Sequence, residues 1–145
     1  MAFVDGQTLT AAQLNAAFAS LLSQAALQAT AVVTEPIAAN AFVNIYSSAG
    51  VLSVRNAIAT DLSTAASGFV QSAYVIGQAA VINMLGINAG VTVTAAAIPG
   101  VWLSETVPGG FTTTQPTTTG HISQSLGQAM PRLGIFFTIN PAYVQ

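Results

Sequence analysis

Charge is what this sequence lacks most. Only six of its 145 residues carry a full charge, two arginines and four acids, and lysine is absent. A soluble domain is usually about 25% charged, whereas this chain is 4% charged. A free monomer normally needs a mixed, charged surface to stay dispersed. We therefore expect much of this protein's surface to lie against neighbouring molecules in an assembly.

Cysteine is absent as well, which excludes disulfide bonds and thiolate chemistry. A net charge of −2 with two arginines leaves no basic surface for DNA, RNA or anionic lipid. We therefore predict no nucleic-acid partner and no membrane partner. The most apolar stretch, residues 69–86, contains no run of 18 apolar residues because four polar side chains interrupt it, namely Gln71, Ser72, Gln78 and Asn83. The first residues also lack the basic and apolar regions of a secretory signal.

The residues that most enzymes need are missing too. His121 is the only histidine, so a Ser/His/Asp triad would need it as the base, and no Gly-x-Ser-x-Gly turn is present. The glycine-rich stretch 86–90 is followed by no lysine, which excludes a phosphate-binding P-loop. We predict a protein that is not an enzyme and holds no metal or cofactor. His121 is interpreted as a packing or surface residue.

A helix is expected near the N-terminus. Thr10 to Gln13 match the capping-box pattern, and no Gly or Pro follows until after Gln28. Apolar residues recur here at the 3-4-3-4 spacing of a coiled-coil seam, namely Ala11, Leu14, Phe18, Leu21 and Ala25. Residues 1–30 are thus interpreted as an arm and helix for oligomerisation or docking. The helix forms a bundle with its own copies, packs on a different protein, or packs on its own domain.

The remainder, residues 31–145, has the texture of a β-rich domain. A hairpin is predicted over 41–58, with a turn at Ser47 to Gly50. Further strands are predicted over 69–76, 79–85, 90–94, 101–104, 122–126 and 134–139. The threonine-rich stretch 112–120 is expected to be a loop or edge strand, and the tail from residue 140 irregular. The fold class is therefore mainly β, an N-terminal α-helix followed by an antiparallel barrel or sandwich, whose strand edges need cover from a neighbour.

Three residues stand out as candidate intersubunit contacts. Arg55 and Arg132 are either solvated or paired with an acid across a subunit boundary, where an arginine fork would set the register. Trp102 is interpreted as a core or intersubunit anchor. In the competing hypothesis of a carbohydrate-binding module, Trp102, Tyr46 or Tyr74 would be the stacking platform.

Several segments resemble known proteins. Residues 3–15, Phe-Val-Asp-Gly-Gln-Thr-Leu-Thr-Ala-Ala-Gln-Leu-Asn, resemble the opening of tailed-bacteriophage appendage proteins, including tail fibres. Later segments resemble small phage virion domains of the capsid-decoration and fibre type, over residues 35–40, 54–57, 68–70, 102–104, 108–113 and 120–127. The chain departs from these proteins at turns, where it has Ser, Asn or Gln instead of charged residues.

The resemblance implies a β-rich, commonly trimeric protein bound to the outside of a capsid or tail. We expect a homotrimeric capsid decoration (cement) protein that is made in the host cytoplasm and joins the virion. Its expected partners are its own copies and the major capsid protein or tail proteins. The alternative is a tail-fibre, adaptor or other tail-appendage protein, and a carbohydrate-binding module is a more distant one. The short chain favours decoration over a fibre that reaches a receptor.

Overall fold

The computed structural model describes residues 10–16, 27–93 and 100–145. Residues 11–16 form the expected helix. Its capping box is in place: the Gln13 backbone N–H donates to Thr10 Oγ1 at 3.2 Å, and the Thr10 N–H donates to Gln13 Oε1 at 3.0 Å. These reciprocal bonds satisfy donors that the first helical turn leaves unpaired. The start of the predicted helix is thus confirmed.

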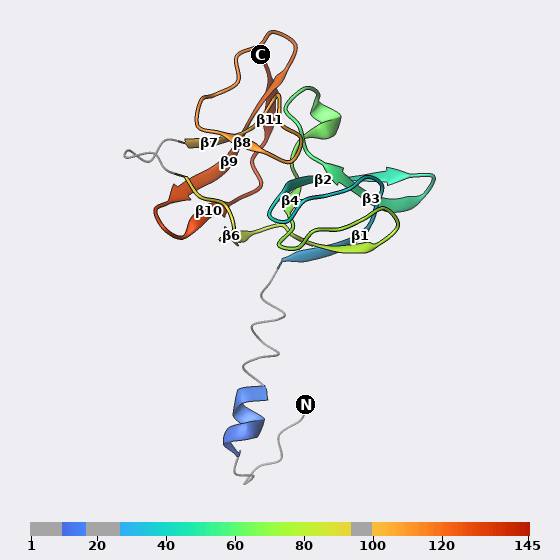
Figure 1. The fold of residues 1–145 in the computed structure, drawn as a ribbon, viewed down its shortest axis with the longest axis vertical. Coiled ribbons are helices and arrows are strands. Elements are labelled where there is room, and N and C mark those ends of the chain that lie inside the picture. Colours follow the sequence, from blue (N-terminus) through green and yellow to red (C-terminus); the bar gives the residue numbers. More distant parts are fainter. Residues whose placement is uncertain (1–9, 17–26, 94–99) are drawn as a thin grey trace.

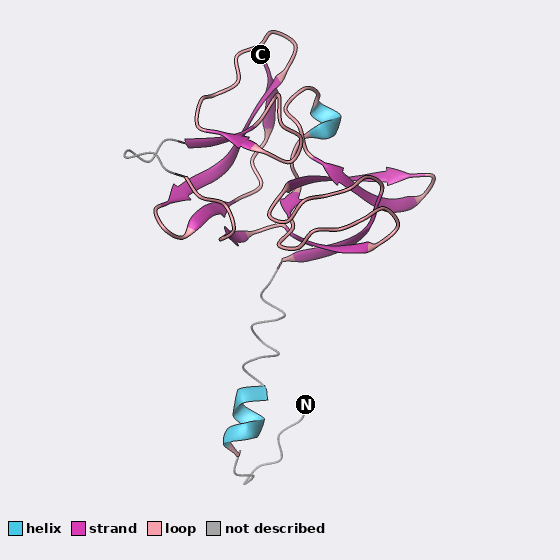
Figure 2. Ribbon diagram, in the orientation of Figure 1, coloured by secondary structure: helices cyan, strands magenta, loops and turns pink. Residues whose placement is uncertain are grey.

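The rest of the described chain is mainly β, as predicted, and contains two sheets (Figures 1 and 2). The first is a closed five-stranded barrel in the order β1-β3-β2-β4-β5. Its strands are β1 (Gln28–Val33), β2 (Phe42–Ser48), β3 (Val51–Asn56), β4 (Gly68–Phe69) and β5 (Ala79–Asn83). A short 3-10 helix, η1 (Leu62–Thr64), lies between β3 and β4.

The second sheet has six strands and packs beside the barrel (Figure 1). Five of them run in the order β6-β10-β9-β7-β8, and β11 pairs with the first part of β9. The strands are β6 (Gly86–Asn88), β7 (Gly100–Leu103), β8 (Phe111–Thr112), β9 (Ile122–Met130), β10 (Gly134–Phe137) and β11 (Ala142–Val144). The long strand β9 therefore forms the centre of this sheet.

The barrel interior is filled by small and branched side chains. In β1 the buried residues alternate with exposed ones, so that Ala31 and Val33 point inward. In β5 the same alternation buries Ala80 and Ile82. A barrel of few strands has a narrow interior, which explains why alanine occupies many inward positions. Part of the alanine content of the chain is thus a packing requirement of the barrel.

Three phenylalanines join the two sheets. Phe42 of β2, Phe69 of β4 and Phe137 of β10 are each at most 1% exposed, and their ring centroids lie 5.8 to 6.5 Å apart. These separations and the tilted or edge-to-face orientations are the favourable geometries for aromatic pairs. The outer side of the barrel thus forms one continuous core with the second sheet.

The predicted hairpin is confirmed as β2 and β3, paired antiparallel from Val43 with Asn56 to Ser48 with Val51. Its two-residue turn places Ala49 at φ 50° and Gly50 at φ 79°. Positive φ at both turn positions is the requirement of a type I′ turn, which suits the twist of a hairpin.

Other boundaries differ from the prediction. Strand β1 begins at Gln28, where helix-forming composition suggested that the helix still continued. A strand over 69–76 is wrong, since β4 ends at Phe69 and only Tyr74 pairs again, in an isolated bridge with Ile37. After Tyr74 the chain turns at residues 76–77, where the Gln78 side chain accepts a hydrogen bond from the Val75 N–H at 2.9 Å.

Three further differences concern pairing. Residues 90–93 form no strand. The side chains of Val91 and Val93 pack against the core, but their backbone pairs with no described strand. The tail, predicted to be irregular, contributes β11. Strands β1 and β3 are parallel, with Val32 opposite Ser53, so that the barrel is not wholly antiparallel.

Candidate functional site

The predicted helical seam is only partly described. Ala11 and Leu14 lie in the helix 11–16, where every residue is exposed, and Leu14 is 45% exposed. Phe18, Leu21 and Ala25 lie outside the described residues. Leu14 is therefore available for contact with another molecule, and its packing in the predicted seam stays a prediction.

Arg55 is held within its own chain. Its Nε donates to Asn44 Oδ1 at 3.0 Å, and a terminal nitrogen donates to the Ser63 carbonyl at 2.9 Å. The guanidinium also lies 4.5 Å from the centroid of the Tyr46 ring, a cation–π geometry. These contacts tie β3 to the η1 segment and use two of the five N–H donors of the guanidinium, so an intersubunit contact of Arg55 stays a prediction.

Arg132 is placed very differently. It is exposed in the turn between β9 and β10, with a φ of 64° that is unusual for a residue other than glycine. Within the described ranges, no carboxylate lies within 4.0 Å of an arginine nitrogen. Of the two arginines singled out from the sequence, Arg132 is therefore the better placed for a contact with another molecule.

Glu35 and Glu105 accept hydrogen bonds from other parts of the fold. Glu35 Oε1 accepts both the backbone and the side-chain N–H of Asn56, each at 2.8 Å. Glu105 Oε1 accepts the Thr118 hydroxyl at 2.6 Å, and its Oε2 lies 3.5 Å from His121 Nδ1. His121 thus packs against an acid near the start of β9. In the described part of the chain, no three acidic or histidine side chains gather as a metal site would require.

The aromatic candidates separate into two groups. The Tyr46 hydroxyl donates a hydrogen bond to Thr34 Oγ1, and the Arg55 guanidinium lies over the Tyr46 ring. The Tyr74 hydroxyl accepts a hydrogen bond from the Val81 N–H. Both are thus used inside the barrel unit. Trp102 is only half-buried on β7 and lines an open groove. Of its two predicted roles, that of a core anchor is therefore wrong, and that of an intersubunit anchor stays a prediction.

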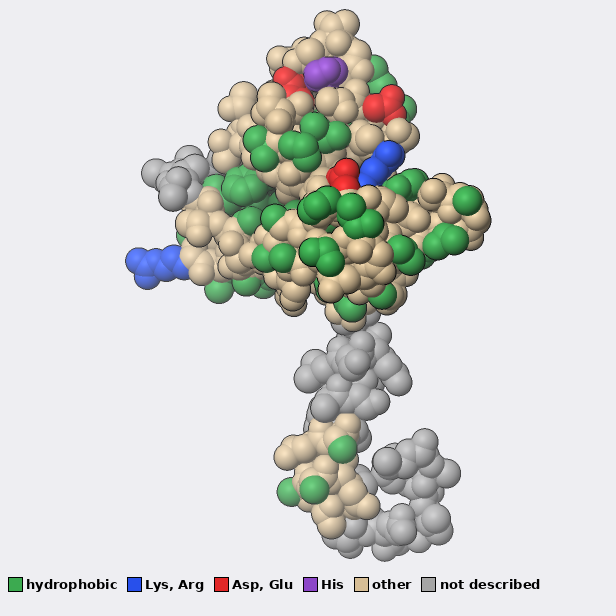
Figure 3. Space-filling model, turned by 45° about the vertical axis from the view of Figure 1, so that its right-hand side comes forward, with side chains coloured by type: hydrophobic (Ala, Val, Ile, Leu, Met, Phe, Trp, Pro, Cys, Tyr) green, Lys and Arg blue, Asp and Glu red, His purple; other side chains and the backbone are tan. Residues whose placement is uncertain are grey.

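An exposed apolar surface, which the sequence did not reveal, lies on β6 and β10. Ile87 and Phe136 are directly opposite each other in the ladder and are 39% and 40% exposed. Leu85, just before β6, is also exposed. We call Leu85, Ile87 and Phe136 the β6 face. The space-filling view shows apolar groups scattered over this side of the domain and only a few charged groups (Figure 3).

The β6 face lies at the end of the domain where β1 begins (Figure 1). The Met84 N–H, next to this face, donates to the Leu27 carbonyl at 2.8 Å. Leu27 is itself 54% exposed and precedes β1. From Leu27 onward, the chain therefore enters the barrel beside the β6 face.

Among the described residues, no helix is both long and apolar enough to cross a membrane. Comparison with protein-family models, with curated proteins and with solved structures gave no match. The residues and geometry described above are therefore the basis for a functional proposal.

Proposed function

We propose that this protein is a structural component of a tailed-phage virion, a homotrimer that decorates the capsid and stabilises its shell from outside. The observation that carries the proposal is an apolar, nearly uncharged surface next to the entry of the N-terminal segment. Exposed apolar patches of this kind mark protein contacts. The trimeric state and the virion location come from the resemblance of the sequence segments to phage proteins.

Two exposed apolar surfaces support association. Leu14 lies on the N-terminal helix, and the β6 face lies beside Leu27 at the entry to β1. Each of them is available to other copies of the chain. Burying polar groups such as Ser, Thr and Gln costs less than burying charges, which suits a surface almost free of charge.

Mass measurement tests the oligomeric state. Light scattering of the full chain at micromolar concentration should give about three times 14.7 kDa. A monomer under these conditions would contradict the proposal.

Two variants locate the contacts. Leu14→Asp should dissociate the trimer if the helices pack on each other, because an unpaired buried charge costs about 3–5 kcal/mol. Ala16→Asp, on the helix face opposite the predicted seam, is the matched control and should leave the mass unchanged. Replacing Ile87 and Phe136 together by Gln should weaken the trimer with an unchanged circular dichroism spectrum. A trimer that survives all of these changes would exclude both surfaces as self-contacts.

The role in the virion needs a particle assay. Capsids prepared without the protein should bind it and become more resistant to heat and shear. Binding to tails but not to capsids would favour the alternative, a tail-fibre or adaptor protein. Binding to neither particle would reject both virion roles.

A further inference from the structure

A groove of about 290 Å³ lies on the solvent-facing side of β9. Its floor contains Ser123 and Ser125, which share one face of the strand because side chains two residues apart point the same way. The neighbouring strands place an aromatic residue on each side. Trp102 of β7 is opposite Ser125 in the ladder, and Tyr143 of β11 is opposite Ser123. The groove is therefore a hydroxyl floor between two aromatic walls.

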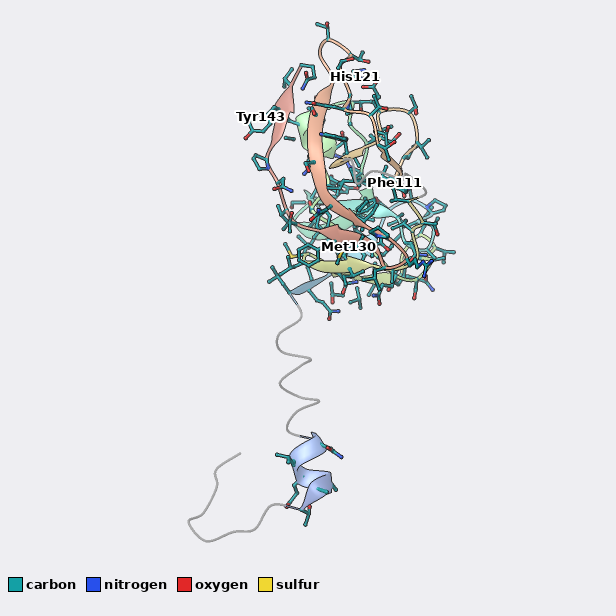
Figure 4. All side chains as sticks on the ribbon, turned by 90° about the vertical axis from the view of Figure 1, so that its left-hand side faces the viewer. Phe111, His121, Met130 and Tyr143 are labelled. Carbon is teal, nitrogen blue, oxygen red and sulfur yellow. The ribbon has the colours of Figure 1, made fainter. Side chains whose placement is uncertain are left out.

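The two walls differ in exposure and in packing. Tyr143 is 65% exposed and stands on β11, beside β9 and away from Phe111 on β8 (Figure 4). The Trp102 ring lies against its own strand, over Gly100, where an added Cβ would come within 2.7 Å of ring atom Cη2. The indole is thus held in one position by packing, and the glycine leaves the space that it needs.

Two amide side chains add polar groups to the groove. Gln115 Nε2 donates to Ser123 Oγ at 3.0 Å, and Asn140 Nδ2 donates to the Ser125 carbonyl at 3.1 Å. These bonds fix the orientation of both amides. In the described part of the chain, nothing donates to Gln115 Oε1 or Asn140 Oδ1, so both oxygens are available to accept from a ligand.

The groove carries no charge. None of the residues that line it is an acid, an arginine or a histidine. Glu105 lines a separate hollow nearby, where Thr118 and His121 engage its carboxylate. A phosphate, a nucleic acid or an acidic ligand would find no counter-charge here. The occupant that suits this site is neutral, with an apolar face and several hydroxyl groups.

We propose that the groove binds a neutral carbohydrate, with Trp102 and Tyr143 as its stacking platforms. The C–H face of a pyranose ring packs on an aromatic surface, while its hydroxyls donate to the amide oxygens and exchange bonds with the serines. Binding sites that combine apolar walls with a few fixed polar groups follow this design. The inference is independent of the oligomeric state and of a capsid or tail location.

Tryptophan fluorescence offers a direct assay, since Trp102 is the only tryptophan of the chain. An array of neutral oligosaccharides of glucose, galactose, mannose and N-acetylglucosamine should identify ligands of the full-length protein. Titration with the best of them should change the intensity or wavelength of the Trp102 emission. Sialylated and sulfated glycans on the same array should bind more weakly, because the groove has no cation.

Variants connect binding to the groove. Tyr143→Ala should weaken binding at least about tenfold, as loss of aromatic stacking does at comparable sites. Tyr143→Phe keeps the ring and should retain most of the affinity. Ile76→Ala, an exposed apolar change on the barrel, is the control and should bind like the parent. All variants are compared by thermal unfolding, and Trp102→Phe gives a second test by calorimetry if Tyr143→Ala unfolds.

Three results would overturn the inference. One is the absence of binding to every neutral glycan at millimolar concentration. Another is binding that Tyr143→Ala leaves unchanged, which would place the ligand elsewhere. A clear preference for charged glycans would also contradict a neutral groove.

Discussion

Gln124 is a buried polar side chain that makes three hydrogen bonds in the core. It points inward from β9 and is 2% exposed. Its Oε1 accepts the Ala66 N–H at 2.7 Å, and its Nε2 donates to the Ala66 carbonyl at 2.9 Å and to the Asn140 carbonyl at 3.0 Å. One amide therefore connects the segment after η1, the central strand β9 and the segment before β11.

The change Gln124→Glu keeps the shape of the side chain but replaces its Nε2 donor by a carboxylate oxygen, which can only accept. The carboxylate still accepts from Ala66, but its second oxygen faces two carbonyl oxygens and cannot donate to them while ionised. An uncompensated buried charge costs about 3–5 kcal/mol, a large share of the roughly 5–15 kcal/mol that stabilises a typical domain. We expect a loss of about 3–5 kcal/mol at pH 7, which corresponds to a fall in Tm of about 6–20 °C.

Acid should partly restore the variant. Protonation gives the carboxyl one donor, so it again matches a carbonyl as the amide did. Burial of the charge places the folded-state pKa of this introduced carboxyl above its unfolded value, and the deficit relative to the parent should shrink as the pH falls from 7 toward 5. Gln128→Glu, exposed on the same strand, is the control and should change stability by less than about 0.5 kcal/mol.

The assay is urea unfolding followed by circular dichroism at both pH values and at one protein concentration, because association shifts apparent stability. A Gln124→Glu protein as stable as the parent at pH 7 would refute the reasoning. A deficit that stays the same at pH 5 would show that the loss does not come from the buried charge.

Two other predictions follow from backbone and cap geometry. Hydrogen bonds from Ser63 lower the pKa of Asp61 below its usual 3.8, with the larger effect from the Ser63 side chain and the smaller from its backbone N–H. The ionised carboxylate therefore stabilises the fold fully above about pH 4, and this effect is lost as the pH falls through the folded-state value. Urea unfolding of Asp61→Asn should show a deficit at pH 7 that disappears in acid, and a constant deficit would contradict this cause. Gly127 has φ 120°, and an added Cβ would collide with the Phe136 carbonyl, so Gly127→Ala should cost about 4 kcal/mol. Gly50→Ala, at φ 79° with open space around it, should cost only about 1 kcal/mol in the same unfolding measurement, and equal costs would refute the clash.

Local patterns predicted the parts of the fold that local chemistry determines. The hairpin 41–58 follows from strand-forming residues around a turn whose Gly50 accepts positive φ. The helix start follows from the reciprocal bonds of Thr10 and Gln13. Strand β1 was missed because Gln28 to Val33 contain alanines that suit a helix equally well, and only pairing with β5 and β3 makes them a strand.

Surface features were harder to predict because they depend on distant pairings. Phe136 and Phe137 are neighbours of the same type, yet Phe136 is 40% exposed and Phe137 is fully buried. The register of β10 decides which of the two faces solvent. Likewise, Tyr143 lies in a tail without clear strand signals, so nothing in the sequence placed it beside Trp102.

The aromatic cluster that joins the two sheets also has a consequence for biosynthesis. The barrel strands lie within residues 28–83 and can pair as soon as that stretch has left the ribosome, whereas Phe137 is added only eight residues before residue 145. Until then, Phe42 and Phe69 have no partner from β10 on their outer side. At about 5–20 residues per second, the nascent barrel carries this uncovered aromatic surface for several seconds. That interval is when the chain is most open to capture by a chaperone or by another nascent copy.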